Sequence, residues 1–174
     1  MNRIFLALVS ALLACLCATP AQADEIFGGL YVHDIDSPLT LSGVESGIDI
    51  QVGWRGDPLK LLKLQPHAFV AVNSAGNTHY GAIGISRKFG DRIYIRPGLG
   101  IAVHTGSAAK HQIFGNNEIE FGSRVLFEPE LAVGARLDDR MSIEASWVHL
   151  SHATLFSDQN PGIDNVGLRL NYKL

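Results

Sequence analysis

The strongest constraint on the fold is a regular alternation of apolar and other residues that runs through the chain after position 24. The stretches Ile93–Val103 and Val125–Leu137 place an apolar residue or a proline at every second position. Because successive side chains of a strand point to opposite sides, this period predicts long strands with one apolar and one mixed face. Strands of about ten residues with such faces are typical of antiparallel barrels that cross the bacterial outer membrane.

We expect one domain over residues 24–174, an all-β, eight-stranded antiparallel transmembrane barrel of the outer-membrane type. The expected strands cover 25–34, 46–55, 64–73, 78–89, 92–104, 118–137, 141–151 and 163–174. Tight turns are expected at 89–91 and 138–140, and longer polar connections at 35–45, 105–117 and 152–162. Short periplasmic turns and longer external loops are the usual asymmetry of such barrels, although the connection at 56–63 is long for a periplasmic turn.

Residues 1–23 are predicted to be a secretory signal peptide that is removed after Ala23. Arg3 precedes an apolar stretch that is too short for a membrane helix, and small residues precede the cleavage site. An alternative is a lipoprotein signal that ends at Cys15. It fits less well, because Leu13 is large for its position and the apolar run continues beyond the cysteine.

Both cysteines, Cys15 and Cys17, lie in this leader, so disulfides and thiolate chemistry are not expected in the mature chain. The full chain has a formal net charge of −3, and loss of Arg3 makes it one unit more negative. Without a basic stripe, nucleic acid is not expected as a partner. No metal or nucleotide motif is present in the sequence, so no cofactor is expected.

Alternation also occurs in soluble β-sandwiches and in lipocalin-like barrels, which are the alternative folds. The length of the strands, an apolar face that is mostly free of charge and a C-terminal strand favour the membrane barrel. The last strand places five apolar or aromatic residues on one face: Val166, Leu168, Leu170, Tyr172 and Leu174. This resembles the assembly signal of outer-membrane proteins, although those usually finish on Phe.

A barrel of eight strands is narrow enough to be filled by its own side chains, so an open pore is not expected. Charged residues with the parity of the lumen are expected to neutralise one another there. They are Asp49, Arg55, Lys88, Arg96, Glu128, Glu130, Arg136, Glu144 and Arg169.

The alternation fails in the last hairpin. In the expected strand 141–151 the outer set begins with apolar Ile143, Ala145 and Trp147. The next two members of that set are His149 and Ser151, which project from the same face within reach of each other. Polar groups that face hydrocarbon are costly unless they pair or serve a function.

Extending the outer set of the last strand backwards gives a third polar residue, Asp164. The three compose a Ser–His–acid set, with Ser151 as nucleophile, His149 as general base and Asp164 orienting the imidazole. With both chain ends in the periplasm, the set lies near the outer leaflet, where lipopolysaccharide carries ester-linked acyl chains. The alternative is that these residues end a strand and meet lipid headgroups without a chemical role.

The His-Leu-Ser sequence at 149–151 and the Asn-Pro-Gly-Ile-Asp sequence at 160–164 resemble the C-terminal signature of the lipid A 3-O-deacylases, the PagL family. The close resemblance covers about the last thirty residues, and the rest is similar in size, export signal and strand pattern. It implies an eight-stranded outer-membrane barrel that releases a 3-hydroxyacyl chain from lipid A. The family's His, Ser and acid fall on His149, Ser151 and Asp164.

The chain departs from the family pattern in two ways. His152 stands where members commonly have Asn, and the acid is Asp on a loop one residue longer, where some members use Glu. Asn160 matches a family position and is a candidate oxyanion donor, with turn initiation as its alternative role. His152 is a second candidate for support of the site.

The expected function is therefore an outer-membrane serine esterase with lipopolysaccharide as its substrate and partner. Two alternatives stay open, namely a non-catalytic barrel that serves adhesion or envelope structure through its 105–117 loop, and an acyl hydrolase that acts on phospholipid. The sequence leaves the oligomeric state open, with a homodimer among the options.

Overall fold

The computed structural model describes residues 23–37, 44–60, 62–111, 115, 118–155 and 160–174. The expected signal peptide lies outside the described residues except for Ala23, the first residue of the first strand. In the described part, no helix is long and apolar enough to cross a membrane.

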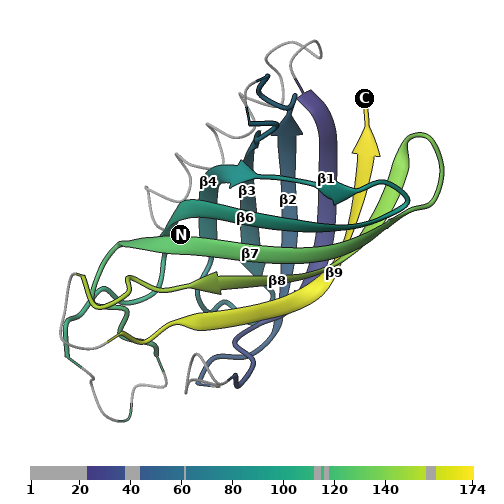
Figure 1. The fold of residues 1–174 in the computed structure, drawn as a ribbon. Coiled ribbons are helices and arrows are strands. Elements are labelled where there is room, and N and C mark those ends of the chain that lie inside the picture. Colours follow the sequence, from purple (N-terminus) through teal and green to yellow (C-terminus); the bar gives the residue numbers. More distant parts are fainter. Residues whose placement is uncertain (1–22, 38–43, 61, 112–114, 116–117, 156–159) are drawn as a thin grey trace.

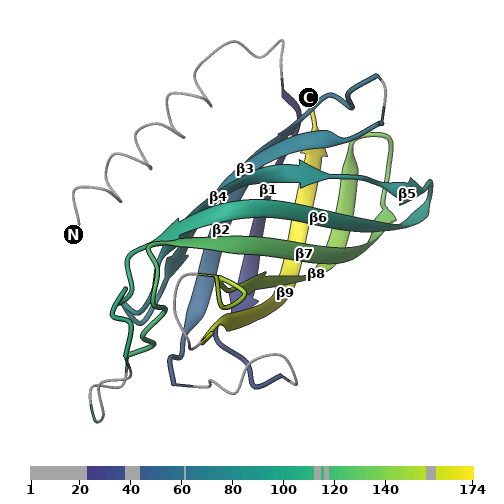
Figure 2. The ribbon, with the colours of Figure 1, turned by 60° about the vertical axis from the view of Figure 1, so that its left-hand side comes forward.

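Eight long antiparallel strands close into a barrel (Figure 1, Figure 2). They are β1 (Ala23–Val32), β2 (Ile48–Gly56), β3 (Gln65–Asn73), β4 (Tyr80–Ser86), β6 (Ile93–His104), β7 (Val125–Arg136), β8 (Met141–Leu150) and β9 (Ile163–Lys173). Each pairs with its neighbours, and the pairs β1–β9 and β4–β6 complete the ring. The expected eight-stranded antiparallel barrel is confirmed.

Most of the expected strand bounds agree with the observed ones to within two residues, and two strands differ by more. The strand expected over 78–89 is interrupted at Arg87 and Lys88, and its end forms the two-residue strand β5 (Phe89–Gly90). The strand expected to start at 118 starts at Val125 instead. The Arg124 guanidinium, just before β7, donates hydrogen bonds to the backbone carbonyls of His104, the last residue of β6, and of Gly106. Ile119 and Phe121 of the preceding segment are buried.

The alternation in the sequence separates an outer from an inner face. On β6 the side chains of Ile93, Ile95, Leu99 and Ile101 are exposed, whereas the residues between them face inwards and are largely buried. The outer surface is therefore an apolar band of the kind that hydrocarbon requires. The described parts of the three long connections, β1–β2, β6–β7 and β8–β9, lie at the end of the barrel away from the C-terminus (Figure 1).

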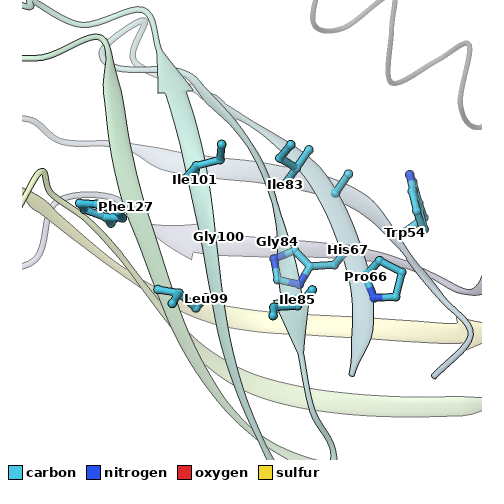
Figure 3. Close-up of a pocket in the computed structure, with 11 residues that line it drawn as sticks. Trp54, Pro66, His67, Ile83, Gly84, Ile85, Leu99, Gly100, Ile101 and Phe127 are labelled. Carbon is cyan, nitrogen blue, oxygen red and sulfur yellow. The ribbon is translucent and has the colours of Figure 1, made fainter. Parts of the chain in front are cut away.

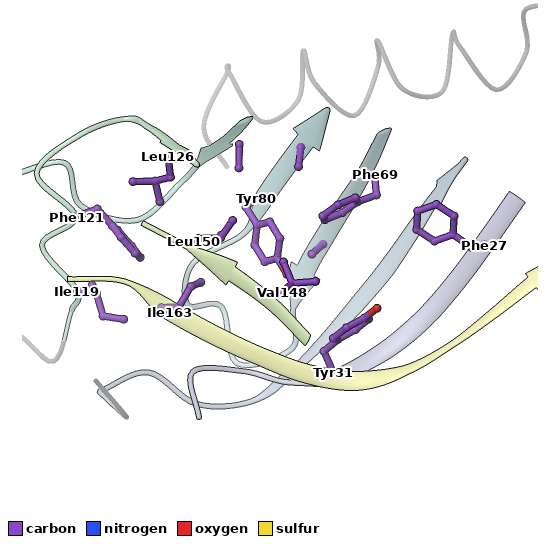
Figure 4. Close-up of a cluster of buried hydrophobic side chains, with 13 residues drawn as sticks. Phe27, Tyr31, Phe69, Tyr80, Ile119, Phe121, Leu126, Val148, Leu150 and Ile163 are labelled. Carbon is purple, nitrogen blue, oxygen red and sulfur yellow. The ribbon is translucent and has the colours of Figure 1, made fainter. Parts of the chain in front are cut away.

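An apolar cluster fills the part of the barrel near these connections (Figure 4). Ile119 and Phe121 of the β6–β7 connection belong to it together with Leu126, Leu150 and Ile163 of the strands. Deeper in the lumen, buried guanidinium and carboxylate groups pair with one another. The Nε atom of Arg169 lies 2.9 Å from Glu144, and its Nη1 atom lies 3.1 Å from Glu130.

Seven of the nine charged residues expected in the lumen are buried: Asp49, Arg55, Arg96, Glu128, Glu130, Glu144 and Arg169. The expectation is wrong for the other two, which lie at the end of the barrel with short turns, where water reaches them. Lys88 is half-buried, with its ammonium 4.0 Å from the centre of the Tyr94 ring, and Arg136 is exposed beside Asp91 at 3.2 Å.

Candidate active site

The backbone brings the three candidate residues together at the end of the last hairpin. His149 is the penultimate residue of β8 and is the direct cross-strand partner of Asp164, the second residue of β9. Ser151 lies just beyond β8 and forms an isolated antiparallel bridge with Phe127 of β7. Backbone hydrogen bonds of 2.7 and 3.2 Å fix this bridge, so both neighbouring strands position the hairpin end.

The side chains form a continuous chain of hydrogen bonds. The Nδ1 atom of His149 lies 2.9 Å from Oδ1 of Asp164, and its Nε2 atom lies 2.9 Å from Oγ of Ser151. A proton on Nδ1 is donated to the carboxylate, which leaves Nε2 to accept the hydroxyl proton. This order of groups is the one that activates serine for attack on an acyl carbon.

The three residues have the same strand parity as exposed apolar residues but are themselves buried. Ala145 on the same face of β8 is exposed, whereas His149 is 9% exposed, Ser151 7% and Asp164 0%. Part of the shielding comes from Trp147, whose indole stacks on the His149 ring with 5.8 Å between ring centres. A low-polarity surrounding strengthens hydrogen bonds between charged groups.

Two further side chains bind the carboxylate, and the sequence reasoning missed them. The indole N–H of Trp147 donates to Oδ1 of Asp164 at 2.8 Å, and the hydroxyl of Ser37 donates to Oδ2. Trp147 was expected only to face lipid. Its place two residues before His149 on the same strand face is the signal that could have found it.

Asn160 and His152 contact each other across the β8–β9 connection. The side-chain oxygen of Asn160 accepts a hydrogen bond from the backbone N–H of His152 at 3.1 Å, and the His152 side chain is fully buried. This contact joins the two ends of the connection, which fits the turn role of Asn160. The oxyanion role of either residue stays a prediction.

A shallow groove of about 590 Å³ runs along the outer wall of the barrel next to this site (Figure 3). Ile101 and Ile83 form one wall, and Leu99 and Ile85 form the other. Gly100 and Gly84, which are cross-strand partners, lie between the walls. The groove is lined almost entirely by carbon.

The strand register connects this groove to the candidate nucleophile. Ser151 bridges to Phe127, Phe127 pairs with Ile101, Ile101 with Ile83, and Ile83 with Ala68. Because neighbouring strands lie about 4.8 Å apart, the row extends over about 19 Å from Ser151. The backbone row that starts at Ser151 therefore leads to Phe127, Ile101, Ile83 and Ala68, which all line the groove.

A closed antiparallel barrel that carries hydrogen-bonded Ser, His and Asp side chains has the groups that an ester hydrolase uses. The family model of lipid A 3-O-deacylase (PagL) matches residues 48–173, and the chain belongs to this family of ester hydrolases. The match extends from β2 to β9 and includes all three candidate residues.

Two solved structures align with most of the chain. The outer membrane enzyme PagL aligns with a TM-score of 0.58 and 20% identity, over 86% of this chain and 99% of that chain. Neisserial surface protein A aligns with a TM-score of 0.49 and 12% identity, over 86% of this chain and 96% of that chain. No curated protein matches the sequence.

No group of three or more His, Cys, Asp or Glu residues that could hold a metal ion occurs within the described ranges.

Proposed function

We propose that this protein is an outer-membrane serine esterase that hydrolyses the 3-O-linked acyl chain of lipid A, with Ser151, His149 and Asp164 as its triad. The observation that carries the proposal is the pair of 2.9 Å hydrogen bonds that join the three side chains in that order. Family membership supplies the ester and the lipid.

The chemistry follows from this order. The Ser151 hydroxyl oxygen attacks the ester carbonyl carbon while its proton moves to Nε2 of His149, and Asp164 stabilises the imidazolium that forms. The tetrahedral intermediate collapses, and His149 returns the proton to the leaving sugar oxygen. A water molecule, deprotonated by His149, then attacks the acyl-enzyme carbonyl. His149 returns this proton to the departing Ser151 oxygen, which releases a 3-hydroxy fatty acid and restores the enzyme.

The place of the site on the barrel fits a substrate that stays in the membrane. With both termini in the periplasm and the signal peptide removed after Ala23, β8 runs outwards and Ser151 lies at the outer-leaflet boundary. The triad shares its strand faces with exposed apolar residues, so we place it on the lipid-facing outer wall. An ester bond of lipid A can reach it by lateral diffusion.

The groove gives the acyl chain a path from the ester bond. Its cross-strand row starts close to the loop end of β7 at Phe127 and reaches the middle of β3 at Ala68. A chain that follows the row therefore descends from the outer boundary into the bilayer. Apolar burial in the trough holds the chain while its carbonyl lies at Ser151.

The test is incubation of the purified barrel in detergent with lipopolysaccharide, followed by mass spectrometry of the free fatty acids. We expect wild type to release a 3-hydroxy fatty acid and Ser151→Ala to release none. No release by wild type in several detergents, or equal release by the variant, overturns the proposal. A parallel incubation with glycerophospholipid separates this function from that of a phospholipid hydrolase.

A further inference from the structure

We propose that Trp147 and Ser37 are positioning residues that hold Asp164 in place. Residues 33–37 form a segment, called the strap, that brings Ser37 against the Asp164 carboxylate. The inference rests on the proposed function, because it assigns a role within the same site. It extends the site from the last hairpin to the first long connection of the barrel.

Both carboxylate oxygens of Asp164 accept hydrogen bonds. Oδ1 of Asp164 accepts hydrogen bonds from both His149 and Trp147, at 2.9 and 2.8 Å, while Oδ2 accepts one from Ser37. The terminal torsion of an aspartate is broad, so one hydrogen bond alone leaves the carboxylate free to turn. Donors on both oxygens fix its plane, with Oδ1 directed at the imidazole.

Trp147 also restrains the base itself. Its indole stacks on the His149 ring with an interplanar angle of 26° while its N–H binds the acid. The same side chain therefore limits rotation of the imidazole and of the carboxylate. A base and its orienting acid that stay aligned during the reaction need less reorganisation.

Two hydrogen bonds attach the strap to β9. The backbone N–H of Ile35 donates to the Asp164 carbonyl at 2.8 Å, and the backbone N–H of Asp34 donates to Oδ1 of Asn165 at 3.0 Å. Asn165 in turn donates to the Tyr80 hydroxyl inside the barrel at 3.1 Å. Ser37 is thus delivered by a backbone that is tied to the acid's own strand.

The strap is also anchored by contacts of Asp34 and His33. Asp34 has a left-handed backbone with φ of 53°, and its carboxylate accepts the backbone N–H of Glu45 at 2.9 Å. The preceding His33 lies between Asp49 and Glu45, 2.9 Å from each. A strained backbone of this kind persists only where its surroundings hold it. The strap is therefore a fixed part of the site.

The test compares two variants that each delete one donor, Trp147→Phe and Ser37→Ala. We expect kcat for 3-hydroxy fatty acid release to fall about tenfold for Trp147→Phe and about threefold for Ser37→Ala, with KM within twofold of wild type in both cases. Matched controls are Tyr172→Phe, which deletes an outer-face hydrogen bond at the far end of β9, and Ser46→Ala, which deletes a hydroxyl in the same connection. Both controls should behave as wild type.

A double-mutant cycle with Asp164→Ala separates positioning from general stability. If Trp147 acts through the acid, adding Trp147→Phe to Asp164→Ala causes no further loss of kcat. If Trp147→Phe lowers kcat by the same factor in the Asp164→Ala background as in the wild-type background, the inference is overturned. Wild-type kcat in both single variants also overturns it. Heat-dependent gel mobility shows whether each variant forms a barrel.

A second readout keeps this test independent of the lipid. The maximal rate of Ser151 labelling by a fluorophosphonate, measured by intact mass, should fall in the same order across the variants. Labelling of wild type without any fatty acid release overturns the proposed substrate but still tests the strap. Absence of labelling in wild type overturns both proposals.

Discussion

His149 and Asp164 face each other directly across the β8–β9 pair, and their side chains meet in a hydrogen bond of 2.9 Å. Cross-strand partners on one face have Cβ atoms about 5 Å apart, which is the separation that a His and an Asp need to touch. The shorter acid therefore suits this site because the strand register supplies the reach. An acid carried on a loop would lack this fixed separation from the His149 side chain.

The charge of Asp164 is expected to be essential. Asp164→Asn keeps the size of the side chain but removes the charge that stabilises the imidazolium, so kcat should fall by about a thousandfold or more. Asp139→Asn, an exposed turn residue, is the matched control and should leave kcat unchanged. Rates of fatty acid release measure both, and wild-type activity of Asp164→Asn would exclude it as the orienting acid.

A substitution that fills the groove should lower activity on long acyl chains more than on short ones. Ala68→Phe places a ring at the deep end of the row that starts at Ser151, so long-chain esters should lose about tenfold in kcat/KM. A butyrate ester ends before this point and should be hydrolysed as by wild type. The control Val133→Phe adds the same ring to an exposed outer position of β7. Equal losses for short and long esters would show that the chain does not follow this row.

The lumen network should dominate the stability of the barrel. Glu144 lies 2.9 Å from Arg169 and 3.1 Å from Arg96, and all three side chains are buried. Glu144→Gln leaves guanidinium charge uncompensated and should lower the free energy of unfolding by about 3–5 kcal/mol. The exposed pair of Asp91 and Arg136 gives a control, because Asp91→Asn should cost less than about 1 kcal/mol.

Urea unfolding in detergent micelles, followed by tryptophan fluorescence, measures both of these variants. Similar midpoints for the buried and the exposed variant would contradict a structural role of the network.

Stability should also depend on pH through His33. Burial lowers the pKa of His33, but the hydrogen bonds and charges of Asp49 and Glu45 outweigh it and raise this pKa from 6.5 to about 9. The pKa of the neighbouring His79 is lowered, chiefly by burial, and the charge of His33 is a further cause of this lowering. A raised folded pKa means that the stabilisation is complete below pH 6.5 and is lost as the pH rises through 9.

A shift of this size corresponds to at most about 3 kcal/mol. The unfolding free energy of wild type should therefore fall between pH 6 and pH 10, and His33→Gln should flatten this change. The exposed His111→Gln is the control and should keep the wild-type profile. A profile that is the same for wild type and His33→Gln would contradict the ion cluster.

The fold could be predicted from the sequence because a barrel has one simple rule, the alternation of its faces. The same rule singled out the three candidate residues, since His149, Ser151 and Asp164 are polar residues on an otherwise apolar face. It could not locate the start of β7, because the alternation continues through Ile119 and Phe121, which precede the strand and are buried in the apolar cluster.

Three parts of the site depend on relations that a linear pattern does not contain. An outward Trp147 is an ordinary residue for a membrane barrel, so its hydrogen bond to Asp164 becomes visible only when β8 and β9 are in register. Ser37 reaches the acid from 127 residues away in the chain. The groove requires the stagger of five strands, which individual strand assignments do not specify.

The most direct test of the central claim is the mass of lipid A itself after incubation with wild type, Ser151→Ala and His149→Gln. Wild type is expected to remove one 3-hydroxyacyl group from the ester at the 3-position, while both variants leave the lipid intact. An unchanged mass with wild type, removal of a chain from another position, or the same product with Ser151→Ala would contradict the claim.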